Sequence, residues 1–258
     1  MSTSSDYEDA VAANIHNASK GLIGIRHKSG IQSMTSYPDV EVKYKGISTW
    51  VEVKMNHTDN LMNPRFKYVD GKWAVSGVDS VAIQELTQIF NTSKDAKKWV
   101  DELRSFIKDP KNKYQGDPAN MTIHSLVGDR ARDKNSVPLI TMKKFLATRP
   151  NKNIFKIENI DVGALVTKHY TKGKSAAALY VSSGDDFYRF GNKNPFKFTN
   201  KQAPVFKGTN GITYRIGDRS SNFEIMVEVK IKNTNAMGSS ETSVKPGSSK
   251  PNPFANLK

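Results

Sequence analysis

The sequence contains no cysteine in its 258 residues. Without thiols the chain can form neither a disulfide framework nor a thiolate zinc site, and it has no cysteine nucleophile. This absence is compatible with a reducing compartment, so we expect a cytoplasmic protein. No run of about 18 apolar residues occurs, which predicts that no helix spans a membrane. The polar, acidic residues 1–9 lack the pattern of a secretory signal.

Sequence patterns of several enzyme classes are also missing. The chain has no Gly-x-Ser-x-Gly, P-loop or dinucleotide-binding glycine pattern, which argues against serine hydrolases and nucleotide-driven motors. No two of its five histidines have the spacing of a zinc site.

Positive charge is what the chain has in excess. Lysine and arginine number 39 against 25 aspartate and glutamate residues, which gives a net charge of +14. A surplus of this size is typical of proteins that neutralise phosphate groups, so nucleic acid is the favoured partner. Membrane-surface and ribosomal proteins share such a charge, and charge alone does not separate these classes.

Periodicity divides the chain into a helical middle and a strand-rich second half. Helical spacing predicts helices over residues 6–22, 81–90, 96–106 and 142–147. Alternation and turn residues predict strands over residues 39–45, 49–55, 176–181, 187–190, 212–216 and 223–231. We expect residues 1–233 to form the folded domain, with a mostly helical insertion over about 76–160.

Residues 234–258 differ in composition from the rest of the chain. They are rich in Ser, Gly, Pro, Asn and Lys with almost no apolar content, which predicts a disordered tail. Within it, Asn252-Pro253-Phe254 is either a short docking motif or an isolated Phe in a flexible segment, and composition favours the second.

Two neighbouring predicted strands, joined by a tight turn at Lys45-Gly46, carry the candidate chemistry. Because side chains alternate along a strand, Glu52 and Lys54 share one face of the second strand. A two-residue turn would place Asp39 of the first strand directly opposite Glu52, with Cβ atoms roughly 4.5–5.5 Å apart.

Two carboxylates placed in this way repel each other unless positive charge lies between them. A divalent cation supplies that charge, and hard oxygen ligands select Mg²⁺ or Mn²⁺. Lys54 projects from the same face, within reach of a metal-bound water or a phosphate. This combination suits phosphodiester hydrolysis. The alternative is an ordinary surface hairpin with a charged outer face.

Pro38-Asp39, followed after twelve residues by Glu52-Val53-Lys54, resembles the PD-(D/E)XK motif of restriction-endonuclease-like nucleases. The resemblance covers chiefly residues 5–75. It implies an α/β fold with a mixed central β-sheet flanked by helices, and DNA hydrolysis with Mg²⁺. It also implies that Asp39, Glu52 and Lys54 are catalytic, with Asp39 and Glu52 holding the metal. Lys168-His169-Tyr170 and the strands up to Phe190 resemble the rest of such a core less specifically.

Glu8 matches the acidic residue of the first helix that helps to bind metal in many members of this superfamily. Its other explanation is a capping box with Ser5, which needs no metal. Both explanations stay open. Glu41 shares the face of Asp39 but lies nearer the turn, so we expect it to be a weaker ligand.

A second Glu-x-Lys occurs at Glu228, with flanking residues much like those of Glu52. A turn at Ser220-Ser221 would place Glu228 opposite Thr213, with no carboxylate to share a metal. We therefore interpret it as part of an exposed strand face. His57 is expected near the site of Glu52 but outside the catalytic set.

Several basic or polar residues are candidates for contacts with DNA backbone phosphates. Asn56 and Arg65 are favoured because they follow the active strand. The others are equally explained as solvated surface: Lys94, Lys97, Lys98, Arg130, Arg132, Lys134, Lys168, Lys172 and Lys174.

Together these features predict a metal-dependent DNA endonuclease, with a homodimer as a possible assembly. The alternative is a DNA-binding or assembly protein that keeps a nuclease-like fold without cleaving. The intact Asp39, Glu52 and Lys54 favour the enzyme, because a degraded site would be expected to lose one of them. The preferred DNA structure or sequence is left open.

Overall fold

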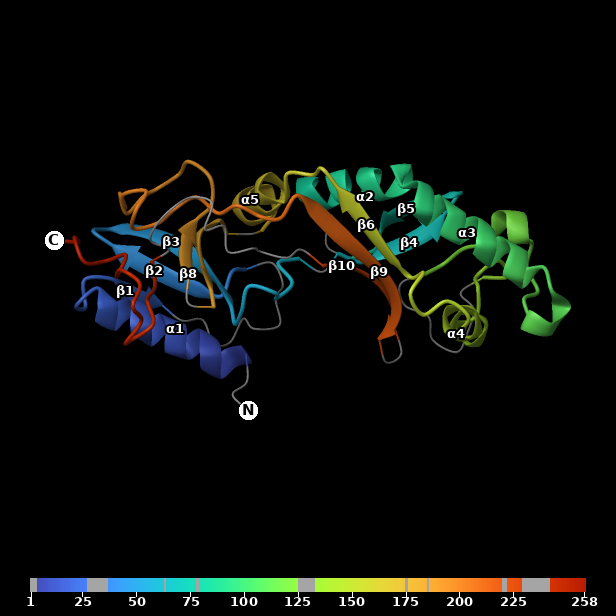
Figure 1. The fold of residues 1–258 in the computed structure, drawn as a ribbon, viewed down its shortest axis with the longest axis horizontal. Helices are drawn as coiled ribbons and strands as arrows, with labels where there is room; N and C mark the ends of the chain where they lie inside the picture. The colour runs from blue at the N-terminus through green and yellow to red at the C-terminus, as the bar shows by residue number, and fades with distance from the viewer. Residues whose placement is uncertain are drawn as a thin grey trace. The chain divides into compact units, whose positions relative to one another are not determined.

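The computed structural model describes residues 4–26, 37–62, 64–77, 79–124, 133–174, 176–184, 186–219, 222–228 and 242–258. The chain divides into two compact units (Figure 1). Unit 1 comprises Met1–Leu61, Asp161–Thr209 and Lys230–Lys258, and unit 2 comprises Met62–Ile160 and Asn210–Val229. No helix of the described part is long and apolar enough to cross a membrane.

Unit 1 is built around a mixed five-stranded sheet of order β1-β2-β3-β7-β8. Its elements are α1 (Ser4–Ala18), β1 (Gly24–Arg26), β2 (Val40–Tyr44), β3 (Ile47–Lys54), α5 (Val162–Lys172), β7 (Ala178–Ser183) and β8 (Asp186–Arg189). Neighbouring strands are antiparallel except β3 and β7, which are parallel. The predicted α/β class, with a mixed sheet flanked by helices, is confirmed.

The two faces of β3 meet different helices. Val51 and Val53 are buried in a core that includes Val11 and Ile15 of α1. Glu52 lies between these valines, so its side chain points to the opposite face, where Tyr170 of α5 contacts it. The sheet is therefore covered by α1 on its apolar side and by α5 at the position of Glu52.

The β2–β3 hairpin has the register that the sequence predicts. Tyr44 pairs with Ile47 and Val40 pairs with Val51 across a turn at Lys45 and Gly46. Both turn residues have positive φ, 46° and 82°, as a type I′ turn requires. The twist of such a turn matches that of the strands it joins, which fixes the pairing.

Helix α1 ends four residues earlier than the apolar spacing predicts. Lys20 and Gly21 have left-handed φ values of 54° and 78°, and the Gly21 N–H donates to the His16 carbonyl (2.9 Å). This is a C-terminal cap in which glycine adopts a conformation that other residues avoid. Leu22, expected on the apolar face of the helix, is 43% exposed.

Residues 242–258 pack within unit 1, which differs from the disordered tail expected over 234–258. Phe254 is buried at 3% exposure against Phe187 and Phe198, with ring centroids 5.5 and 5.4 Å away. The Asn252 side chain donates to the Ala18 carbonyl (2.8 Å). The average composition of the segment does not reveal that one aromatic residue can be buried among other aromatic side chains. The expectation for residues 234–241 lies outside the described residues.

Unit 2 combines helices with two small sheets, β10-β9-β6 and β4-β5. Its elements are β4 (Phe66–Val69), β5 (Lys72–Val75), α2 (Val81–Thr92), α3 (Lys94–Ile107), short 3₁₀ helices at Pro110–Asn112 and Pro118–Asn120, α4 (Leu139–Ala147), β6 (Ile154–Glu158), β9 (Gly211–Arg219) and β10 (Asn222–Glu228). The unit starts earlier than the expected insertion at 76–160. It also takes in residues 210–229, because β9 pairs with β6.

Candidate active site

Asp39 is held at the edge of the β2–β3 hairpin. It lies one residue beyond the last strand pair, Val40 with Val51, so its register partner is Glu52. The backbone N–H of Val53 donates to Asp39 Oδ2 (2.7 Å), which fixes the carboxylate across the hairpin. The register expected from the turn is confirmed up to Val40 and Val51, and its extension by one residue places Asp39 opposite Glu52.

Glu52 is a buried carboxylate with three side-chain partners. It is 2% exposed. Its Oε1 lies 2.7 Å from Lys54 Nζ and accepts from the Tyr170 hydroxyl (2.9 Å), while its Oε2 accepts from Lys174 Nζ (3.2 Å). Burial alone would raise the pKa of Glu52, but the two lysines and the tyrosine outweigh it and lower the pKa to about 2.

For Asp39, the effects that raise the pKa are larger than those that lower it. Burial and the charge of Glu52 raise the pKa of Asp39 to about 7, against smaller lowering effects of Lys54 and the Val53 N–H. The charge of Glu8 raises the pKa of Asp39 further. Both lysine contacts described above are made to Glu52, which leaves Asp39 as the carboxylate with excess negative potential around it.

Lys54 is the cation fixed within this group. Burial would lower its pKa, but Glu52 and Asp39 outweigh that effect and raise the pKa above its usual value. Its side chain is 19% exposed. Lys54 is therefore a protonated ammonium that still reaches the surface. Asp39, Glu52 and Lys54, the three catalytic residues that the sequence predicts, come together in unit 1.

Residues of α5 and the turn after it complete the site, and sequence reasoning did not assign them to it. Burial and Glu52 raise the pKa of Tyr170 well above its ordinary value, so its hydroxyl remains a donor, and it also contacts the Leu61 carbonyl. Burial first, and then Lys174, lower the pKa of His169 to about 4, so its imidazole is neutral. The sequence signals were the segment Lys168-His169-Tyr170 and, as a phosphate-contact candidate, Lys174.

The remaining acidic candidates are placed less centrally. Glu8 accepts from the Ser4 hydroxyl (3.0 Å) within α1, which begins at Ser4, so Ser5 lies inside the helix and not at the N-cap position that the expected capping box requires. Glu41 pairs with Trp50 in the hairpin. Among the described residues no three His, Asp or Glu side chains form a metal-ligand cluster. The charge of Glu8 acts on Asp39, and a role for Glu8 as a third metal ligand stays a prediction.

The chemistry of Asp39 and Glu52 fits a divalent cation. Both supply hard carboxylate oxygens, which suit Mg²⁺ or Mn²⁺. The raised pKa of Asp39, about 7, reflects a position where added positive charge would be stabilising. Glu52 is held within β3 and Asp39 by its hydrogen bond from the Val53 N–H, so both donors are pre-positioned.

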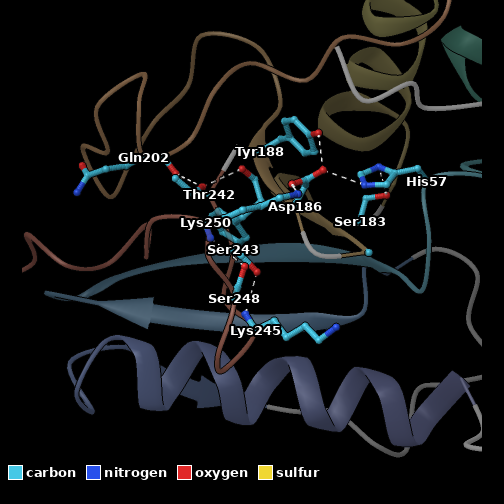
Figure 2. A network of polar contacts seen from close by, with 12 residues as sticks. His57, Ser183, Asp186, Tyr188, Gln202, Thr242, Ser243, Lys245, Ser248 and Lys250 are labelled. Atoms are coloured by element: carbon cyan, nitrogen blue, oxygen red, sulfur yellow. Dashed lines mark hydrogen bonds and ion pairs between the residues drawn. The ribbon is translucent and has the colours of Figure 1, made fainter. Parts of the chain in front are cut away.

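A second polar network lies at the end of β3 (Figure 2). His57 Nε2 lies 2.8 Å from the buried Asp186 Oδ2, and Asp186 also accepts from Tyr188 (3.2 Å) and from Lys250 of the C-terminal segment. Burial would raise the pKa of Asp186, but His57 and Lys250 outweigh it and lower the pKa. His57, expected near the site, therefore has a structural role in joining the loop after β3 to β8.

Ser183, His57 and Asp186 are the residue types of a serine-hydrolase triad, but their arrangement does not support that chemistry. The Ser183 hydroxyl lies 3.5 Å from His57 Nδ1, which is long for a hydrogen bond, and Ser183 is fully buried. A nucleophile must reach its substrate, and this one is inside the fold.

Glu228 of the competing Glu-x-Lys lies in unit 2, and Lys230 lies outside the described residues. Glu228 pairs with Thr213 in the register that the Ser220-Ser221 turn predicts. Of the phosphate-contact candidates, Lys174 instead binds Glu52, and Asn56 accepts from the Thr58 N–H (2.9 Å) in a local turn. Arg130 and Arg132 lie outside the described residues, and the other candidates stay predictions.

Comparisons with protein-family models, with curated proteins and with solved structures found no match to this chain.

Proposed function

We propose that this chain is a Mg²⁺- or Mn²⁺-dependent endonuclease that hydrolyses DNA, with a restriction-endonuclease-like PD-(D/E)XK core in unit 1. One observation carries the proposal. Asp39 is hydrogen-bonded to the Val53 N–H, beside Glu52 on β3, and Lys54 binds Glu52. The mixed sheet and the net charge of +14 support the same conclusion.

Each residue has a role that follows from its surroundings. Asp39 and Glu52 would hold the metal, which when bound supplies an activated water and neutralises charge on the phosphate. Lys54 stays protonated and directs its ammonium to the water or to a phosphate oxygen. Tyr170 donates a hydrogen bond to Glu52, which keeps that carboxylate oriented and ionised.

Plasmid cleavage with three charge-removing variants tests this function. Asp39→Asn, Glu52→Gln and Lys54→Met keep the size of each side chain, and each should lower the cleavage rate by at least about 100-fold in Mg²⁺. Glu228→Gln is the matched control and should cleave normally. Robust cleavage by any of the three, or an inactive control, would show that the wrong residues have been chosen.

Metal dependence separates cleavage from binding. EDTA should stop cleavage completely, while Ca²⁺, whose coordination is looser, should support DNA binding with little cutting. Binding without cutting in Mg²⁺, across duplex, branched and single-stranded DNA, would instead support the non-cleaving alternative. Cutting that survives EDTA would contradict the metal role of Asp39 and Glu52.

A further inference from the structure

Lys174 places a second ammonium group on a carboxylate that already has one. It lies beyond the end of α5, and its Nζ is 3.2 Å from Glu52 Oε2 and 4.6 Å from the centre of the Tyr170 ring. Its side chain is 10% exposed. Lys54 takes the other oxygen, Oε1, at 2.7 Å. Both oxygens of Glu52 are therefore occupied by cations.

The charges of this group balance only while no metal is present. Asp39 and Glu52 carry two negative charges when ionised, and Lys54 and Lys174 carry two positive ones. A divalent ion would add two more, so like-charge repulsion favours the departure of one lysine. Lys54 is fixed on β3 and has the shorter contact, whereas Lys174 lies outside any helix or strand and has the longer one. Lys174 is the cation that can leave.

We propose that Lys174 is a displaceable internal cation of the metal site. It neutralises Glu52 in the metal-free protein and leaves Oε2 when a divalent ion binds, and its ammonium then binds the substrate phosphate. The proposal rests on the metal-dependent function proposed above. It assigns Lys174 a role distinct from that of Lys54, which stays in place in both states.

Metal binding is the first test, because it does not depend on cleavage. Mn²⁺ affinity is measured by calorimetry at physiological salt for the wild type, Lys174→Gln and Lys201→Gln. Lys201 is an exposed residue of unit 1 with no assigned role, so its variant changes the net charge equally. Removing a unit charge close to a divalent ion should tighten Mn²⁺ binding roughly tenfold in Lys174→Gln. The control should change less than about twofold, because salt screens distant charges.

Lys174→Arg keeps the charge and can bind a carboxylate with two hydrogen bonds, so it should not bind Mn²⁺ more tightly than the wild type. Unchanged or weaker binding in Lys174→Gln would overturn the displacement while leaving the proposed nuclease intact. Binding by Lys174→Gln where the wild type shows none would support it. If Mn²⁺ binding is absent from every variant, or insensitive to Asp39→Asn, both proposals fail.

Single-turnover cleavage at saturating Mn²⁺ tests the transfer to phosphate. Lys174→Gln should cut at least about tenfold more slowly than Lys201→Gln, although it binds the metal more tightly. A purely structural role would weaken metal binding and slow cleavage together. Tighter binding with unchanged cleavage would support the displacement and overturn the contact with phosphate.

Discussion

At the scale of single residues, the pKa values of the two neighbouring carboxylates of this site are shifted in opposite directions, upward for Asp39 and downward for Glu52. Glu52 is buried and Asp39 is half-buried, and burial raises the pKa of each. Two ammonium groups contact Glu52 and hold its pKa near 2, whereas Asp39 receives one backbone N–H and the repulsion of Glu52, so its pKa rises to about 7. The difference comes from where the lysines bind, not from depth in the fold.

Asp39 should make the metal-free protein less stable as pH rises. Its pKa is about 7 in the fold and 3.8 in an ordinary environment, so the folded state binds more protons between these values. The stabilising contribution is complete below pH 3.8 and lost as pH rises through about 7. Asp39→Asn removes this dependence, so its melting temperature relative to the wild type should increase by at least about 4 °C between pH 5 and pH 8.

The measurement is thermal unfolding in EDTA at several pH values. Glu41→Gln removes a carboxylate from the same hairpin, and its profile should follow that of the wild type. A constant difference between Asp39→Asn and the wild type across this range would contradict the raised pKa.

At the scale of elements, the C-terminal segment 242–258 is an integral part of unit 1. Its Thr242 carbonyl accepts from the Phe187 N–H (2.7 Å) next to the Lys250–Asp186 pair (Figure 2), and Phe254 lies in the core. One buried aromatic residue and a few directed hydrogen bonds thus attach a segment that is otherwise polar.

Truncating Phe254 should therefore destabilise the fold. Phe254→Ala leaves a cavity beside Phe187 and Phe198, and such changes cost roughly 3–5 kcal/mol of the free energy of unfolding. Urea unfolding measures the loss. Ile47→Ala, at a side chain 45% exposed in β3, is the control and should cost less than about 1 kcal/mol. A Phe254→Ala variant as stable as this control would show that the segment does not contribute to the core.

Local elements could be predicted from the sequence, and long-range partners could not. The register of the hairpin follows from the turn at Lys45-Gly46 and from side-chain alternation, both contained within a few residues. The contacts of Tyr170 and Lys174 with Glu52 depend on how α5 packs and how β7 aligns with β3. No residue pattern within either segment predicts how the two segments align.

At the scale of the whole molecule, the excess of positive charge is spread along the chain beyond the site. Affinity for DNA should accordingly fall steeply with salt, with a logarithmic slope of about −0.9 for each phosphate neutralised on duplex DNA. Fluorescence anisotropy in Ca²⁺ measures the slope. Asp39→Asn should leave it nearly unchanged, because a carboxylate does not release counterions from phosphate. A slope shallower than about −2 would indicate too few phosphate contacts for a nuclease that binds DNA mainly through electrostatic contacts.

The separation of Glu52 from Lys174 also has a consequence for the growing chain on the ribosome. The two residues are 122 positions apart. At about 5–20 residues per second, Lys174 is made roughly 6–24 s after Glu52. During that interval the hairpin carries its carboxylates without the counter-cation and hydrogen bond that α5 and the following turn provide. A nascent chain stalled before Tyr170 therefore contains the complete motif but lacks the helix and strand that hold Glu52 in the fold, and ribosome-bound chains of that length should not cut DNA.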